Sequence, residues 1–313
     1  MPPDLSALSD QISLTPNAPL GIPIALVGAV FLSIGAQLQH RGVVKVEDST
    51  KQPTSDALSI GQLFALLRRP SWVFGTLMLG LAVVFQLFAL VLAPLIVVQP
   101  LGAVALIITA VVHARVAKTK LSRDTIRPIV FCVVGVGLFV TFATIFAHSS
   151  EISEGQLVTI LILLGIITVA FALVFAFLRK RFKAFIYIVG AGVLYGFVAT
   201  LAKVVIDRVH ALIIGSSASH GFEWLTLFCV VALLVATILG GYFVQTAYAS
   251  GPPDLVIAGL TVIDPIVAVT IGIVVLQEAA GAPWFAVIAF AISGALAVYG
   301  VVQLSRRQPE VQH

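Results

Sequence analysis

The chain contains little charge. Charged residues make up 10% of its 313 residues and hydrophobic residues 59%, whereas an ordinary soluble domain is about 25% charged. So few charges cannot cover the surface of a soluble fold, and the composition therefore predicts an integral membrane protein. The formal net charge of +4 comes from short loops between apolar runs, so it does not indicate a nucleic-acid partner.

Cysteine and histidine are scarce as well. The two cysteines lie inside apolar stretches and the six histidines are scattered, which offers neither a disulfide framework nor a cluster for metal or acid–base chemistry. The sequence has no Walker motif or other phosphate-binding loop, which a nucleotide-driven protein would need. These absences argue against an enzyme, an ATP-driven pump and a bound cofactor, and they leave the identity of any metal open.

Apolar runs of membrane-spanning length are abundant. A helix needs about 20 residues to cross the hydrocarbon core of a bilayer, and nine runs approach or exceed that length within a single transmembrane domain at 22–304. These runs are 22–39, 71–92, 95–114, 127–147, 156–178, 184–206, 224–246, 255–277 and 284–304. We therefore predict an all-α integral membrane protein with about nine transmembrane helices.

Lysine and arginine alternate between the loops. The first, third and fifth loops hold about five, five and four of them, and the second and fourth loops hold none. Because positive loops are cytoplasmic, the sequence predicts a multi-pass protein of the plasma membrane. Its tail at 1–21 is then outside the cell, and its tail at 305–313 is in the cytoplasm.

Two predicted spans carry the same pattern. Residues 99–113, QPLGAVALIITAVVH, and 264–278, DPIVAVTIGIVVLQE, each place a polar residue before a proline and another thirteen positions after it. The match predicts a duplication, with repeat 1 at 22–147, a connector helix at 156–178 and repeat 2 at 184–304. A single-span connector makes the second repeat enter the membrane in the opposite sense, which gives a 4+1+4 inverted repeat typical of transporters.

The same segments resemble a known superfamily. IDPIVAVTIGIVVLQE, at 263–278, is similar to the closing motif of the drug/metabolite transporter superfamily. LAPLIVVQPLGAVALIITAVVHARVAKTKLS, at 92–122, resembles the NIPA branch of that superfamily. The resemblance implies about nine spans, paired inverted halves and transport of magnesium. It departs from the branch at 118–120, where Lys-Thr-Lys stands in place of the usual Lys-Glu-Lys.

Asp264 is the first candidate functional residue. It lies near the middle of a span, where an ionised carboxylate is costly unless it is paired or hydrated, so we expect it to bind a proton or a cation. Pro265 frees a carbonyl of the preceding turn for the same site, and Pro100 is its counterpart in the repeat. The alternative is a protonated aspartate that hydrogen-bonds a neighbouring helix.

Other polar side chains in the spans are further candidates. The glutamines must find partners in a dry environment, so they either bind substrate in a central cavity or hold helices together. Lys203 is expected to be a counter-ion for Asp264, an anchor for an anionic substrate or a snorkelling lysine. His113 and Glu278 lie at helix ends and are expected to cap or gate on opposite membrane faces. The predicted binding set is Asp264, Gln86, Gln245, Gln99, Lys203, Gln37 and Tyr248.

These features together predict a secondary transporter. One intramembrane carboxylate offers few ligands to a divalent cation, so the first prediction is a small organic solute coupled through Asp264. A NIPA-like magnesium transporter is the alternative, and a membrane scaffold without transport is an alternative of another class. The expected partners are the solute or ion and membrane lipid, and a homodimer is left open.

Overall fold

The computed structural model describes residues 18–50, 68–116, 123–149, 152–178, 183–214, 222–250 and 253–306. Regular structure in these residues is helical, and nine segments are long and apolar enough to cross a membrane. This confirms the predicted all-α membrane fold. The helices are α2 (Ala18–Thr50), α4 (Pro70–Leu92), α5 (Leu95–Leu101), α6 (Val104–Val116), α7 (Arg123–Phe146), α8 (Glu154–Leu178), α9 (Lys183–Ile214), α10 (Phe222–Ser250), α11 (Pro253–Val274) and α12 (Trp284–Ser305).

Two predicted spans differ from the helices that contain them. The span expected at 22–39 agrees with the apolar segment Pro19–Gln39, but its helix α2 begins at Ala18, inside the predicted tail at 1–21, and continues to Thr50. The third span, expected as one helix over 95–114, consists of the two helices α5 and α6. The rest of the N-terminal tail and all but the first two residues of the tail at 305–313 lie outside the described residues.

Prolines explain how the third span begins and why it breaks. Pro94 keeps Ala93 extended, at φ −136° and ψ 152°, because the residue before a proline avoids the helical region. Pro100 has no N–H for the helix. Past it, Gly102 and Ala103 donate to the carbonyls of Gln99 and Pro100, both at 3.2 Å. These three-residue closures separate α5 from α6.

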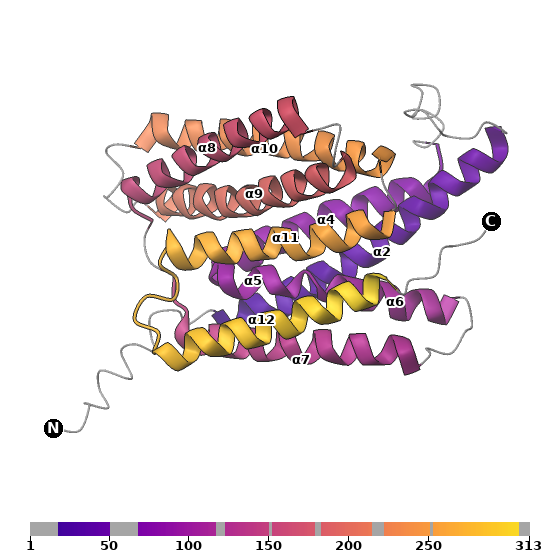
Figure 1. Ribbon diagram of the computed structural model, residues 1–313, viewed down its shortest axis with the longest axis horizontal. Helices are drawn as coiled ribbons and strands as arrows, with labels where there is room; N and C mark the ends of the chain where they lie inside the picture. The colour runs from indigo at the N-terminus through magenta and orange to yellow at the C-terminus, as the bar shows by residue number, and fades with distance from the viewer. Residues whose placement is uncertain are drawn as a thin grey trace.

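The helices run roughly alongside one another, as Figure 1 shows. In that view α8 and α10 form one edge of the bundle, α7 and α12 form the other, and α5 and α11 lie between them. Extensive contacts join α2 to α4 and α9 to α10, which are corresponding pairs in the two predicted repeats. This pairing agrees with a duplication, while the axis relating the halves stays a prediction.

Glycines allow the closest helix contacts. A Cβ atom on Gly300 of α12 would meet the backbone of Cys132 in α7, and one on Gly196 of α9 would come within 2.6 Å of the Val267 side chain in α11. In lipid, where apolar burial between helices gains little, such close packing is a main source of helix association. In the α7–α12 and α9–α11 pairs, the two helix backbones therefore lie in close contact.

Three even-numbered loops meet at one end of the bundle. The backbone N–H of Leu95, after the second loop, donates to the Glu278 side chain in the eighth loop. The N–H of His148, in the fourth loop, donates to the Glu278 carbonyl at 2.8 Å. Helices that cross a membrane alternately place loops of the same parity on one face, so these contacts agree with the predicted number and order of spans.

Candidate functional site

The two prolines of the repeated motif line one cavity. This cavity has a volume of about 90 Å³ and lies between α5, α7, α11 and α12, with Pro100 and Pro265 in its wall. The rest of its lining is almost wholly apolar, apart from Thr261. The broken third span and the proline-containing α11 thus approach each other in the middle of the protein.

Asp264 precedes Pro265 on α11 and lies against α9. A Cβ atom on Gly196 would come within 3.0 Å of the Asp264 carbonyl oxygen, so the two backbones are almost in contact. Tyr195, next along α9, lies within electrostatic reach of the carboxylate. The buried Oδ1 atom of Asp264 has no hydrogen-bond partner among the described residues. The alternative, a protonated aspartate that hydrogen-bonds a neighbouring helix, therefore lacks its hydrogen bond at this oxygen.

Gln99 occupies the corresponding position in the other half of the protein. Its side chain is 5% exposed, and its buried Nε2 atom also has no partner in the described part of the chain. A buried polar atom left without a partner costs about 1–3 kcal/mol. Gln99 and Asp264 are thus two polar groups, each one residue before a proline, whose buried atoms would gain free energy from a ligand.

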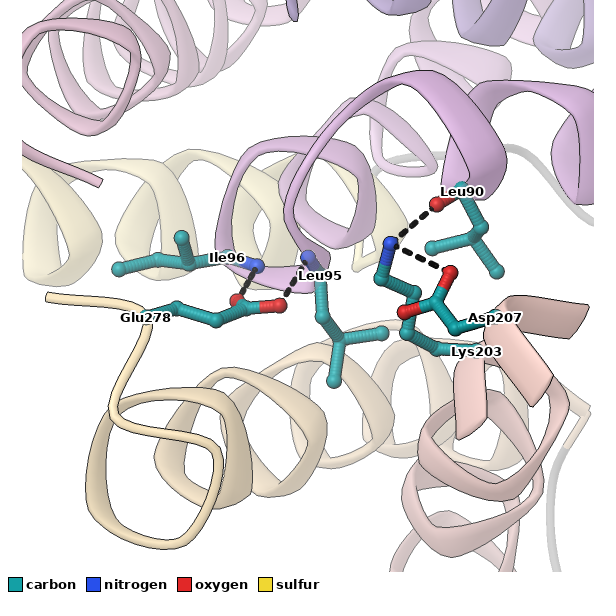
Figure 2. A network of polar contacts seen from close by, with 6 residues as sticks. All are labelled: Leu90, Leu95, Ile96, Lys203, Asp207 and Glu278. Atoms are coloured by element: carbon teal, nitrogen blue, oxygen red, sulfur yellow. Dashed lines mark hydrogen bonds and ion pairs between the residues drawn. The ribbon is translucent and has the colours of Figure 1, made fainter. Parts of the chain in front are cut away.

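A second polar site lies where Pro94 separates α4 from α5. Leu90 of α4 lacks its helical donor, because Pro94 has no N–H, and the first N–H groups of α5 have no partner within their own helix. Repeat 2 supplies the donor that the end of α4 lacks and the acceptor that the start of α5 lacks. Figure 2 shows the Lys203 ammonium beside the Leu90 carbonyl and the Glu278 carboxylate against the backbone of α5.

Glu278 caps the start of α5. Its Oε1 accepts a hydrogen bond from the Leu95 N–H at 2.7 Å and its Oε2 accepts one from the Ile96 N–H at 2.8 Å. An acid at a helix N-terminus also interacts favourably with the helix dipole. The side chain is 2% exposed, and the expected role as a helix cap therefore matches its contacts.

Lys203 was expected to pair with Asp264, to anchor an anionic substrate or to snorkel, and its contacts match neither the pairing nor the snorkelling. It is 2% exposed, its Nζ donates to the Leu90 carbonyl at 2.5 Å, and it forms an ion pair with Asp207 at 3.1 Å. The Lys203 ammonium thus lies at the C-terminal end of α4, where the helix dipole favours positive charge. The spacing of four residues between Lys203 and Asp207 on one helix is a signal that the sequence contains.

The loop after α11 turns Glu278 back toward α5. Gln277 has a φ of 57°, in the left-handed region that commonly ends a helix, and the Glu278 N–H donates to the Gly272 carbonyl at 2.9 Å. A cavity of about 10 Å³ adjoins the carboxylate, with Ser149, Lys203 and Asp207 in its wall. That is room for about one water molecule.

The charge of Glu278 responds to several neighbours. Glu278 lies in the loop between the last two spans, and burial raises the pKa of its carboxyl from 4.5 to about 7. The N–H groups of Ile96 and Leu95 and the charge of Lys203 lower that pKa, while the charge of Asp207 raises it. The carboxyl therefore titrates close to neutral pH.

The remaining candidates do not gather around Asp264. Gln37 donates to the Thr109 carbonyl at 3.4 Å, which ties α2 to α6 in the manner of helix-to-helix contacts. Gln86 and Gln245 have exposed side chains, so a dry common interior for this pair is not what the structure describes. His113 and Tyr248 lie in α6 and α10, and their side chains fall outside the described residues.

Within the described part of the chain, no group of three or more His, Cys, Asp or Glu side chains could hold a metal ion. A cation bound among these residues would complete its coordination with backbone carbonyls, amides or water. Hard cations such as Mg²⁺ accept all three of these ligands.

Comparisons with known proteins place the chain in a family. The family model described as magnesium transporter NIPA matches residues 17–308. An uncharacterized protein of Corynebacterium glutamicum is 25% identical over 289 residues, covering 92% of this chain and 95% of that relative. No solved structure matches the chain significantly. This multi-pass membrane protein therefore belongs to the NIPA magnesium transporter family, within the drug/metabolite transporter superfamily.

Proposed function

We propose that this protein is a secondary transporter of Mg²⁺ or another hard divalent cation, with Asp264 as its charged ligand. The observation that carries the proposal is the buried Oδ1 of Asp264, which lacks a hydrogen-bond partner among the described residues. Retaining such a group inside a span is costly, and intramembrane acids commonly mark ion pathways. The family match supports transport of this kind.

The two proline motifs offer further oxygen ligands. Pro265 cannot donate to the carbonyl of Thr261, and Pro100 cannot donate to that of Ile96, so each proline leaves one carbonyl of α11 or α5 without its helical donor. The Gln99 amide adds an oxygen, since the amide can be turned to present either atom. Magnesium keeps several of its own waters and needs only one or two carboxylates, so one aspartate suffices.

An organic solute, the first prediction from the sequence, remains the second candidate. The observation that favours it is the apolar cavity of about 90 Å³ beside Pro100 and Pro265, since pockets for organic ligands are mostly apolar. In this case the same Asp264 carboxylate would carry the coupling proton or cation. The two candidates differ in whether Mg²⁺ itself crosses the membrane.

Flux measurements on purified protein test the proposal. In proteoliposomes containing a Mg²⁺-sensitive dye, we expect Asp264→Asn to lower the initial rate of Mg²⁺ entry roughly tenfold or more, because the neutral amide cannot supply the ligand charge. Glu154→Gln, which removes an exposed carboxylate at the start of α8, is the matched control and should leave the rate unchanged. The melting temperature of Asp264→Asn should be equal to or higher than that of the wild type, since a costly buried charge is gone.

Two other results would reject this assignment. Wild-type rates of Mg²⁺ entry in Asp264→Asn would show that the carboxylate is structural. An absence of Mg²⁺ entry in the wild type, with uptake of a labelled metabolite pool that Asp264→Asn abolishes, would favour the organic solute. We further propose that the protein lies in the plasma membrane with its N-terminus outside, as the distribution of Lys and Arg between loops indicates.

A further inference from the structure

We propose that Glu278, Lys203 and Asp207 form a polar latch that closes the path to Asp264 at the end of the bundle where the loops after α4, α7 and α11 meet. The latch breaks and re-forms in each transport cycle. The inference rests on the proposed transport function, because a closed entrance has a purpose only in a protein that passes a substrate.

The latch joins the two predicted repeats. Glu278 follows α11 in repeat 2 and binds the N-terminus of α5 in repeat 1, with both oxygens in use. Lys203 lies on α9 in repeat 2 and binds the Leu90 carbonyl of α4 in repeat 1. A transporter built from repeats works by rocking one part against the other around a central site. Contacts that cross between the repeats at one end of the molecule must break when that end opens.

The chemistry of these contacts suits repeated opening. Each bond joins a charged side chain to a backbone group left unpaired by Pro94, so opening exchanges these partners for water without disturbing any helix. The cavity of about 10 Å³ beside Lys203, Asp207 and Glu278 gives water a place to enter. The α7–α12 contact also crosses between the repeats, but there Gly300 packs directly against the Cys132 backbone, and it offers no such exchange.

The latch lies above Asp264 along one face of α9. Lys203, Thr200 and Gly196 are spaced along α9 by three and four residues, so they share a face. Gly196 contacts the Asp264 backbone, and the Thr200 side chain is 0% exposed and donates to the Gly196 carbonyl. Thr200 is therefore one turn deeper than the latch and one turn short of the proposed cation site.

Thr200 can report whether the latch is open. In a background where the two buried native cysteines, Cys132 and Cys229, are replaced by alanine, Thr200→Cys introduces a single thiol below the latch. A membrane-impermeant maleimide added at the latch side should label this thiol slowly in otherwise wild-type protein. The rate of labelling then measures how often water reaches past the latch.

Two variants open the latch by different routes. Glu278→Gln replaces one of the two oxygens that accept the α5 N–H groups with an amide NH2 donor. Gly272→Ala keeps every charge but places a Cβ atom 2.9 Å from the Glu278 Oε2 atom, which displaces the carboxylate from the Ile96 N–H. We expect each to raise the labelling rate of Thr200→Cys roughly tenfold, because each removes a hydrogen bond that holds the latch closed.

Matched controls separate opening from general loosening. Glu154→Gln removes an exposed carboxylate, and Gly165→Ala adds a Cβ atom in α8 with no neighbouring heavy atom within 4 Å. Both should leave the labelling rate unchanged. If Glu278→Gln does not fold, Gly272→Ala still decides the question.

Unchanged labelling in every folded latch variant would overturn the latch. An equal increase in the controls would overturn it too, because the reporter would then be reading overall stability. Labelling requires no Mg²⁺ flux, so it is independent of the cargo. Faster labelling in a protein that does not carry Mg²⁺ would uphold the latch and reject only the proposed cation.

Discussion

Two carboxylates inside this protein have opposite surroundings. Both oxygens of Glu278 accept backbone N–H groups, whereas the Oδ1 of Asp264 has no partner among the described residues. Hydrogen bonds offset part of the cost of a buried charge, whereas a buried charge without them destabilises the protein unless a ligand completes it. The contrast agrees with a structural role for Glu278 at the helix ends and supports our proposal that Asp264 binds the ligand.

At the residue scale, we expect Glu278 to make stability depend on pH. Its pKa is raised from 4.5 to about 7, so the folded protein binds its proton more tightly than the unfolded chain does. The contribution of Glu278 to the free energy of unfolding is therefore full below pH 4.5 and is lost as the pH rises through about 7. This loss lowers the free energy of unfolding by about 3 kcal/mol. The charged groups facing it are Lys203 and Asp207, and His148 is its backbone neighbour.

Melting temperatures of purified protein measure this effect. Between pH 5 and pH 8 the wild type should lose more stability than Glu278→Gln, whose amide does not titrate. Glu154→Gln, with an exposed carboxylate removed, should follow the wild-type curve. Parallel curves for the wild type and Glu278→Gln would show that this carboxyl does not titrate differently on folding.

The sequence allowed Asp264 to be identified but not the partners of Lys203 and Glu278. An acid inside an apolar run is evident from the letters alone, whereas Glu278 bonds a backbone N–H that lies 183 residues earlier in the chain. The glutamines show the same limit, because Gln99 is buried while Gln86 and Gln245 are exposed. In lipid, both the packed and the outer face of a helix are apolar, so periodicity does not tell them apart.

At the element scale, two prolines at matching positions of the repeated motif affect their helices differently. Pro265 leaves α11 continuous, whereas Pro100 is followed by the break between α5 and α6. Proline costs a helix about 3 kcal/mol and glycine about 1 kcal/mol, and only Pro100 has a glycine, Gly102, two positions later. The sequence contained this signal, but a window that measures average hydropathy reads both segments as single spans.

The α7–α12 pair provides a prediction at this scale. Gly300→Ala places a Cβ atom against the Cys132 backbone, which cannot move aside as a flexible side chain would. We expect a loss of about 1–3 kcal/mol, as is typical of overpacking, seen as a lower melting temperature in detergent. Gly137→Ala in α7, where the added Cβ has no neighbouring heavy atom within 4 Å, is the control and should not be destabilised. Equal stability of the two variants would mean that the helices separate at little cost.

At the scale of the whole molecule, the lengths of the apolar runs predicted the nine spans found among the described residues, while the relation between the two repeats stays a prediction. How the halves meet could not be predicted, because it depends on contacts between distant glycines and on backbone groups freed by Pro94. The structure joins the predicted repeats through α7 with α12, α5 with α11, and the latch. The first two contacts are apolar, and the third is polar and lies at one end.

The orientation of the molecule in the membrane is the last prediction. Glu154, at the start of α8, and Arg306, just after α12, are exposed residues that the span order places at opposite ends. Phe146 and Phe285 stack edge to face at 5.7 Å, which places the start of α12 beside the end of α7 and so at the Glu154 end. Because cytoplasmic loops carry the Lys and Arg excess, Glu154 should lie outside the cell and Arg306 inside.

In the background without native cysteines, an impermeant maleimide applied to intact cells should label Glu154→Cys, and it should label Arg306→Cys only after permeabilisation. Labelling of Arg306→Cys alone in intact cells would invert the orientation and place the latch on the cytoplasmic side. Labelling of both cysteines in intact cells would contradict the odd number of spans that lies between these two residues in the chain.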